Sequence, residues 1–361
     1  MLRDLTIQNY RCFEDFYIDG LERVNLFVGN NNSGKTSLLE AIYLLANPNK
    51  RDALLEIIDN LTDYYLNNNS FFYSIRHLFF GHKVSKDSKA IIKSDNPKEK
   101  VFSISLSYSN TISNHHNLSL PFLDCSEWQR LSITDTGSIY RLGNRSSFIN
   151  VEDREYIKID KEPQAKKYTQ IERKIDNNIL VSINKILYEK VAFMWDTIAL
   201  TSKEEKIIEA LQIIDKSVER ISFSSSNNAN LIRLKLSDSN EPIPLSSMGE
   251  GMYRILTMAI SLVTAEDGVL LVDEIETGLH YEAQTDMWRL ILETAKELNV
   301  QVFATTHSWD CIAAYQEALS QVEDSSIGKL FRLDSKYGKL RAVEYDAEDL
   351  DIAVRKGIEV R

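Results

Sequence analysis

The sequence predicts an α/β fold in which a mainly parallel sheet is flanked by helices. Continuous apolar runs at 24–28, 268–274 and 300–307 are typical of parallel strands that are buried on both faces. A helical pattern at about 281–297 separates the last two runs. Two additions to this core are expected, an N-terminal antiparallel β portion and an α+β insertion in the middle of the chain.

The composition is that of a soluble globular protein. The chain has 361 residues, of which 43% are hydrophobic and 26% charged, and this length favours more than one domain. No apolar run is long enough to span a bilayer and no signal-peptide pattern precedes the first strand, so we expect a cytoplasmic protein without a membrane partner. The net charge of −11 disfavours attraction of DNA to the whole surface, but it does not exclude a local basic groove.

The first 46 residues form the expected N-terminal lobe. Apolar and polar residues alternate imperfectly over 2–8, and a second short strand is expected at 16–18. The buried run 24–28 then leads into a glycine-rich loop. The helix after this loop is expected to end near Ala46, because Asn47-Pro48 follows.

The glycine-rich loop, residues 29–36, has the phosphate-loop spacing G-x-x-x-x-G-K-[ST]. Gly29 and Gly34 permit a tight turn that brings backbone N–H groups against an anion, and the helix that begins here adds its dipole. Lys35 supplies a charge for β- and γ-phosphates, and Thr36 supplies a hydroxyl for Mg²⁺. The alternative is a plain glycine turn with a solvent-facing lysine, which the flanking strand and helix disfavour. The predicted nucleotide-binding residues are Asn30, Asn31, Asn32, Ser33, Gly34, Lys35, Thr36 and Ser37.

The segment 47–189 carries no comparable motif, and we expect it to form an inserted arm or lid of helix and sheet. A helical pattern covers 52–66, and alternating apolar residues predict strands at 101–108 and 138–142. The stretch 85–100 is rich in Lys, Ser and Asp, so we expect a solvated loop there.

Ordered patterns return in 190–361, the expected C-terminal lobe. A polar loop around Ser247 leads into an amphipathic helix, and Ser308 is expected to cap the helix that follows the strand at 300–307. The other expected elements are a helix from Ser202 and strands near 219–223, 231–236, 329–333 and 339–345.

Polar side chains follow two of the buried strands. Asp273 and Glu274 end the run at 268–274, and His307 ends the run at 300–307. The carboxyl ends of parallel strands meet at one edge of a sheet, so we expect these residues to lie beside the phosphate loop. Asp273 would reach Mg²⁺ directly or through water, Glu274 would polarise the attacking water, and His307 would touch the γ-phosphate. The alternatives are a solvated pair of loop acids and a structural histidine.

The order of these motifs, with Ser247-Met248-Gly249-Glu250 between them, resembles the ABC-type ATPase head of the SMC and RecF group. In detail the chain is most similar to the OLD (overcoming lysogenization defect) branch of bacterial AAA-type ATPases. The resemblance covers about 1–46 and 190–361. It is carried further by the segments 9–13, 273–280 and 357–361.

The resemblance implies a P-loop NTPase head that hydrolyses ATP with Mg²⁺ and forms a homodimer or a higher oligomer. In such heads two subunits enclose two ATP molecules, and each signature loop completes the partner's site. Here Ser247, Gly249 and Glu250 would play that part, and 276–280 would form the loop between subunits. Arg11 resembles an arginine that lies near the nucleotide in the family; the alternative is an ordinary surface arginine.

Some residues depart from the pattern of the wider ABC family, and these departures disfavour a transporter ATPase. Met248 and His280 replace a glycine and an aspartate of ABC transporters, and no glutamine follows the first helix before Gln129. Residues 308–361 leave too little chain for the Toprim nuclease that OLD-type proteins often carry. We therefore expect an ATP-dependent switch for a separately encoded nuclease or toxin, of the kind used in bacterial anti-phage defence. The alternatives are a RecF-like DNA repair ATPase that binds duplex DNA, and a scaffold that binds nucleotide without hydrolysis, which Glu274 disfavours.

Overall fold

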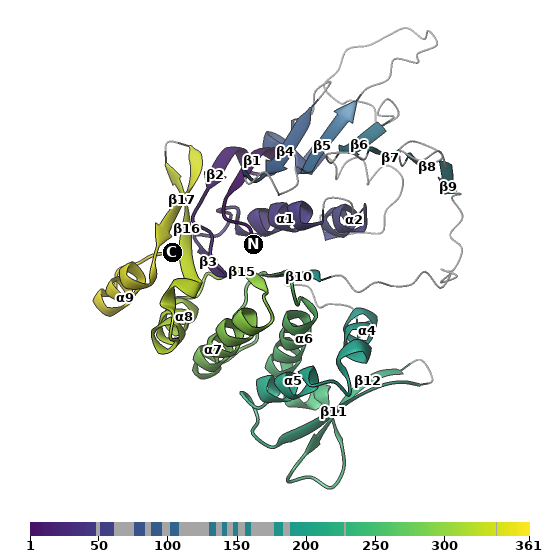
Figure 1. The fold of residues 1–361 in the computed structure, drawn as a ribbon, viewed down its shortest axis with the longest axis vertical. Helices are drawn as coiled ribbons and strands as arrows, with labels where there is room; N and C mark the ends of the chain where they lie inside the picture. The colour runs from purple at the N-terminus through teal and green to yellow at the C-terminus, as the bar shows by residue number, and fades with distance from the viewer. Residues whose placement is uncertain are drawn as a thin grey trace. The chain divides into compact units, whose positions relative to one another are not determined.

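The chain divides into two compact units (Figure 1). Unit 1 comprises Met1, Leu21–Leu39 and Lys174–Arg361, and unit 2 comprises Leu2–Gly20 and Glu40–Arg173. The structure is a computed structural model. It describes residues 1–47, 51–60, 76–83, 88–95, 102–107, 130–134, 139–142, 147–150, 156–159, 177–182, 188–226, 229–336 and 338–361.

Unit 1 is built on a mixed sheet whose described strands run in the order β10-β14-β15-β3-β16-β17. The strands are β3 (Val24–Val28), β10 (Asn178–Val181), β14 (Val269–Val272), β15 (Gln301–Thr305), β16 (Gly328–Lys336) and β17 (Lys339–Tyr345). All neighbours pair in parallel except β17, which runs antiparallel to β16. Every residue of β3 and β15 is buried, as the continuous apolar runs predict.

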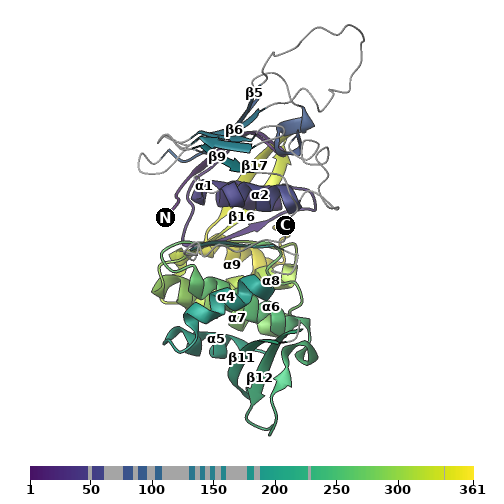
Figure 2. The same cartoon turned by 90° about the vertical axis from the view of Figure 1, so that its right-hand side faces the viewer.

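Helices α6, α7 and α8 lie side by side along one face of this sheet (Figures 1 and 2). The helices described wholly within unit 1 are α4 (Tyr188–Ile198), α5 (Lys203–Leu211), α6 (Glu250–Thr264), α7 (Tyr281–Glu297), α8 (Trp309–Gln321) and α9 (Ala347–Lys356). Trp288 of α7 and Tyr315 of α8 pack with ring centroids 4.6 Å apart. The Tyr315 hydroxyl also donates to the backbone oxygen of Val24 at 2.9 Å, which ties α8 to the central strand.

A small antiparallel sheet of β11 (Val218–Ser226), β12 (Ala229–Leu236) and β13 (Ile243–Pro244) extends unit 1 beyond α5. From β13 the chain enters a short 3₁₀ turn, η3 (Leu245–Met248), which leads directly into α6. The polar loop around Ser247 is therefore held between this small sheet and the main helical layer.

Unit 2 carries an antiparallel sheet with the described strand order β2-β1-β4-β5-β6-β7-β8-β9. The strands are β1 (Leu5–Tyr10), β2 (Phe13–Ile18), β4 (Lys89–Lys93), β5 (Phe102–Ser107), β6 (Arg130–Thr134), β7 (Ile139–Leu142), β8 (Ser147–Asn150) and β9 (Tyr156–Ile159). The helical segments are α2 (Arg51–Asn60), η1 (Arg76–Leu78) and η2 (Phe80–His82). Helix α1 (Lys35–Ala46) contributes residues to both units.

The fold class expected from the sequence is confirmed, with a mostly parallel sheet, flanking helices and an antiparallel N-terminal portion. The solvated loop expected at 85–100 is wrong for its described part, because β4 pairs there with β1 and β5 and buries Ala90 and Ile92. Strand β10 lies within 47–189 but belongs to the main sheet. The division at residues 46 and 189 stays a prediction. Among the described residues, none of the helices combines the length and apolar character needed to cross a bilayer.

Candidate functional site

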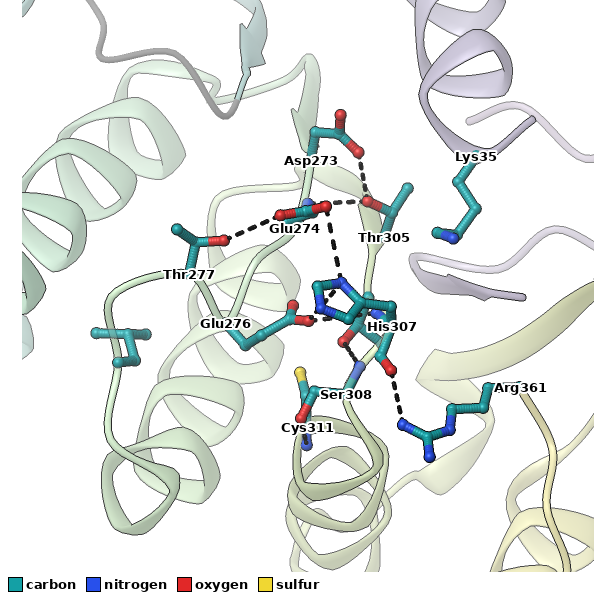
Figure 3. Close-up of polar contacts among 12 residues, drawn as sticks. Lys35, Asp273, Glu274, Glu276, Thr277, Thr305, His307, Ser308, Cys311 and Arg361 are labelled. Atoms are coloured by element: carbon teal, nitrogen blue, oxygen red, sulfur yellow. Dashed lines mark hydrogen bonds and ion pairs between the residues drawn. The ribbon is translucent and has the colours of Figure 1, made fainter. Parts of the chain in front are cut away.

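Lys35, the acids Asp273 and Glu274, and His307 gather at the carboxyl ends of β3, β14 and β15 (Figure 3). These strands are neighbours in the parallel sheet, so the loops that follow them share one edge. Lys35 follows β3 and the phosphate loop, Asp273 and Glu274 follow β14, and His307 follows β15.

The loop between β3 and α1 has the backbone geometry that its glycines imply. Gly29 has φ 150°, and a Cβ there would lie 2.7 Å from the backbone oxygen of Leu333, so a side chain does not fit. Gly34 has φ 92°, which disfavours residues with a side chain, and its carbonyl accepts from Leu38 N–H at 2.8 Å as the helix begins. Asn30, Asn31 and Asn32 are exposed at the tip. The loop thus leaves backbone N–H groups and the helix start available to an anion.

Lys35 is drawn into this loop. Its side chain is 9% exposed, and Nζ donates to the backbone oxygens of Gly29 at 2.8 Å and Asn30 at 3.1 Å. Burial lowers the pKa of the Lys35 ammonium, while the carboxylates of Asp273, Glu274 and Glu276 act in the opposite sense. The Lys35 ammonium is thus fixed inside the loop, where it could form charge-assisted hydrogen bonds to a phosphate bound by the same loop.

Asp273 is the link between the loop and the sheet edge. Thr36 Oγ1 donates to Asp273 Oδ2 at 2.8 Å, although the two residues lie 237 positions apart in the sequence. Thr305 Oγ1 donates to the other carboxylate oxygen, Oδ1, at 2.5 Å. A hydroxyl and a carboxylate side by side are oxygen ligands of the kind Mg²⁺ prefers, so this pair fits a Mg²⁺ ion.

Glu274 has a positive φ of 46°, which is rare for a residue with a side chain. Its N–H donates to Thr305 Oγ1 at 2.9 Å, and its Oε2 accepts from Thr277 Oγ1 at 3.4 Å. The side chain is 32% exposed, so its carboxylate remains open to water. Thr305 therefore orients both acids, a role that the sequence did not reveal because a threonine at a strand end has no distinctive pattern.

His307 lies between two carboxylates. Its ring nitrogen Nδ1 is 3.7 Å from Glu274 Oε1 and 3.5 Å from Glu276 Oε1. The backbone N–H of His307 donates to the same Glu276 oxygen at 3.2 Å. Glu276 is 9% exposed, and among the described residues its Oε2 has no hydrogen-bond partner. The sequence placed Glu276 only in a loop between subunits; the structure adds it to the acids around His307.

Arg254 of α6 binds the backbone of the loop that carries Asp273 and Glu274. Its Nη2 donates to the backbone oxygens of Asp273 at 2.7 Å and Glu274 at 3.1 Å, and its Nη1 donates to Ser182 at 3.2 Å. Burial lowers the pKa of the guanidinium, and nearby acids, with Asp273 foremost, oppose that shift. Sequence reasoning assigned α6 only its apolar positions, so this arginine was missed.

The predicted signature residues stand apart from this network. Ser247 is exposed, and among the described residues its hydroxyl donates only to the backbone oxygen of Pro244 at 2.7 Å. Gly249 has φ 87° and occupies the N-cap position of α6, and the exposed Glu250 begins that helix. The start of α6 packs closely on Gly278: a Cβ at Gly278 would lie 3.3 Å from Glu250 Cγ, and a Cβ at Gly251 would lie 2.6 Å from the Gly278 carbonyl oxygen. The signature loop thus packs on the loop after β14, while Ser247 faces outward.

Arg11 lies in unit 2, in the turn between β1 and β2, with φ 54°. Its guanidinium forms a two-point pair with Glu40, with Nε–Oε2 at 3.0 Å and Nη2–Oε1 at 3.2 Å. Tyr10 OH donates to the same carboxylate at 3.5 Å. The role of Arg11 near a nucleotide stays a prediction, and Gln129 lies outside the described residues.

The acids near the end of the chain have local roles. Asp346 caps α9 by accepting from the N–H of Asp349 at 2.8 Å, and Asp351 pairs with Arg355 one turn later. Within the described ranges, no cluster of three or more His, Cys, Asp or Glu side chains has the arrangement of a metal site. A Mg²⁺ site here would therefore combine Thr36 and Asp273 with oxygens of the nucleotide.

Residues 1–312 match the model of the AAA ATPase domain family. An "ATP/GTP phosphatase" from Helicobacter pylori is 24% identical over 367 residues, covering 93% of this chain and 94% of the relative. The RecF DNA replication and repair protein of Enterococcus faecalis is 51% identical over only 45 residues, which is 12% of each chain.

Solved structures with a similar fold are heads of SMC proteins. A SMC head bound to the C-terminal winged-helix domain of ScpA superimposes with a TM-score of 0.56, at 13% identity, over 97% of this chain and 99% of that one. A Smc head with an extended coiled coil, bound to the C-terminal domain of ScpA derived from Pyrococcus furiosus, gives 0.55 at 11% identity over 99% of each chain. At these identities the likeness establishes the fold.

Proposed function

This chain belongs to the AAA ATPase domain family, and from that premise we propose that it binds ATP with Mg²⁺ and hydrolyses it to ADP and phosphate. The single observation that carries the proposal is the Thr36–Asp273 hydrogen bond of 2.8 Å, which joins the phosphate loop to the acid end of β14. Beside that contact, the Lys35 ammonium and the partly exposed Glu274 carboxylate lie at the same sheet edge.

In this proposal the loop residues bind the phosphates and the metal. Backbone N–H groups from Asn30 to Ser37 surround the β- and γ-phosphates, and Lys35 exchanges its two carbonyl partners for phosphate oxygens. Thr36 and Asp273 hold Mg²⁺, since their oxygens already lie together. When bound between Thr36 and Asp273, Mg²⁺ would supply positive charge to offset the charge that develops on the phosphates.

Glu274 is the proposed general base. Its carboxylate is open to water and accepts from Thr277, and the backbone N–H of Glu274 donates to Thr305, which fixes the start of the side chain at the site. A carboxylate so fixed orients a water molecule and accepts its proton as the water attacks the γ-phosphate. His307, next to Glu274 and Glu276, contacts the γ-phosphate in this proposal.

A second copy of the chain completes the site in this proposal. The support is that Ser247 is exposed. Among the residues that the structure describes, its hydroxyl bonds only to the Pro244 carbonyl. Gly249 and Glu250 begin α6, so the helix N-terminus beside Ser247 suits the γ-phosphate of a partner's ATP. The expected assembly is a homodimer that closes around two ATP molecules.

The direct test is nucleotide binding and phosphate release by the purified chain, with ATP or GTP and with Mg²⁺ or a chelator. The expected result is ATP binding in both conditions and phosphate release only with Mg²⁺. Equal release from GTP would widen the substrate to nucleoside triphosphates in general. Absence of nucleotide binding contradicts the proposal.

The finer proposal is that ATP turnover switches a separately encoded nuclease or toxin, as in bacterial anti-phage defence. Its support is the similarity to OLD-type ATPases and a complete set of hydrolysis residues. The alternative is a RecF-like ATPase that grips duplex DNA, which the short RecF match favours. Purification of Glu274→Gln with ATP from native host cells separates these readings. A bound nuclease or toxin chain supports the switch, and bound duplex DNA supports the alternative. If the purified protein carries no bound partner of either kind, both hypotheses are contradicted.

Thr305→Val is expected to lower ATP turnover about 10- to 100-fold, because it removes the hydroxyl that orients Asp273 and Glu274 and leaves the buried partners unsatisfied. Valine keeps the β-branched shape of threonine and lacks only its hydroxyl, so the substitution tests the hydrogen bonds rather than the strand propensity. Thr305→Ser keeps the hydroxyl and is the matched control, with turnover near that of the unmodified chain. Steady-state phosphate release measures both variants. Full turnover by Thr305→Val would contradict the orienting role.

A further inference from the structure

The segment 357–361 is fixed beside the candidate site. Gly357 has φ 61° at the end of α9, and its N–H donates to Val354 O at 3.1 Å while the N–H of Ile358 donates to Ala353 O at 2.9 Å. Val360 is fully buried and anchors the segment in the core of unit 1. Arg361 therefore projects from an anchored backbone.

The Arg361 side chain reaches the histidine that follows β15. Its Nη1 donates to the backbone oxygen of His307 at 3.0 Å (Figure 3). Its Nε donates to Glu359 Oε1 at 2.6 Å. Glu359 thus fixes one side of the guanidinium while the other side holds His307. The guanidinium is planar, so both bonds together set its orientation.

The His307 peptide groups are consequently held from two sides. The N–H of His307 donates to Glu276 Oε1 at 3.2 Å, and the carbonyl of His307 accepts from Arg361. These bonds leave the imidazole, which is 51% exposed, as the projecting part of the residue. A histidine whose backbone is clamped in this way presents its ring at a defined position.

We propose that Arg361 is a positioning residue that fixes the backbone of His307 and so aims its imidazole at the γ-phosphate. This inference rests on the proposed function, because the phosphate contact of His307 is part of that function. Arg361 acts here through the His307 carbonyl. Its side chain is 42% exposed, so its removal should disturb this contact far more than the core.

The test compares Arg361→Ala and Arg361→Lys with Arg355→Ala. Arg355 is an exposed arginine of α9 that pairs only with Asp351 among the described residues, so it controls for loss of charge from this region. We expect Arg361→Ala to lower kcat about tenfold, the loss typical of a hydrogen bond to a charged group, with KM for ATP changed less than about twofold. Arg361→Lys should recover most of kcat, because its ammonium can still donate to the carbonyl. Arg355→Ala should match the unmodified chain.

A second readout needs no turnover. The chain has six histidines, and imidazole NMR signals of histidine-labelled protein identify His307 by comparison with His307→Gln. Arg361→Ala should shift the His307 signal, and Arg355→Ala should leave it in place. An unmoved His307 signal in Arg361→Ala overturns the positioning role, whatever the turnover. An unchanged kcat in Arg361→Ala, while His307→Gln lowers it, also overturns it and leaves the proposed function standing. A His307→Gln variant with full kcat would instead remove the proposed role of His307.

Discussion

Glu274→Gln is expected to bind ATP as tightly as the unmodified chain and to lose turnover by about 10²- to 10⁴-fold, the range for a general base. Glutamine keeps the size of the side chain, and its oxygen can still accept from Thr277, so the site geometry should persist. The carboxamide cannot accept the proton of the attacking water. ATP titration and single-turnover phosphate release measure the two effects separately.

The same variant should accumulate as a dimer once ATP is added, because in the proposed assembly two copies enclose the nucleotide before it is hydrolysed. Size-exclusion chromatography with light scattering measures the mass with and without ATP. Glu323→Gln is the matched control, since Glu323 is an exposed carboxylate after α8 that pairs with Lys296 and lies outside the loops assigned to the nucleotide or to the second copy. A Glu274→Gln chain that binds ATP but stays monomeric would contradict the two-subunit site.

Lys35→Ala is expected to weaken ATP binding about 10- to 150-fold, the loss expected when a charged hydrogen bond to phosphate is removed. The substitution also takes the donor from the carbonyls of Gly29 and Asn30, so the melting temperature of Lys35→Ala should not exceed that of the unmodified chain. Calorimetric titration with ATP measures the affinity, and thermal unfolding checks the stability.

Lys206→Ala is the control for Lys35→Ala, because Lys206 is a partly exposed lysine of α5 that pairs with Glu297. Its ATP affinity should be unchanged. If Lys35→Ala bound ATP as well as Lys206→Ala does, the phosphate-loop assignment would be wrong, and with it the proposed activity.

The parts of the site that were predictable from sequence are those that a short local pattern specifies. The spacing in 29–36 and the acids after a continuous apolar run each report one strand, one loop and their chemistry. Because parallel strands expose their carboxyl ends at one edge, the meeting of Thr36 and Asp273 also followed. The helix expected at about 281–297 is confirmed as α7 (Tyr281–Glu297), because its apolar residues recur at helical spacing along its whole length.

The missed residues act through contacts that sequence spacing does not encode. Thr305, Arg254 and Arg361 each make hydrogen bonds to segments distant in the chain. Arg361 lies in a segment that carries the family resemblance, but the resemblance does not reveal its contact with His307. Strand β10 is only four residues long, so its apolar run was too short to identify. Strand β4 was obscured by the lysines around its buried positions, Ala90 and Ile92.

The central claim is that each catalytic pocket takes its phosphate loop from one copy of the chain and its signature loop from another. Mixing two inactive variants, Lys35→Ala and Ser247→Arg, tests it directly, because a mixed dimer then contains one intact pocket. Random pairing should restore roughly a quarter of the unmodified turnover. Mixing Lys35→Ala with Glu274→Gln should restore none, since each pocket of that mixed dimer keeps one defect. Both variants must be shown to be folded, so that each can supply the loop that the other lacks. If the mixture of Lys35→Ala and Ser247→Arg then regains no ATP turnover, the account is contradicted.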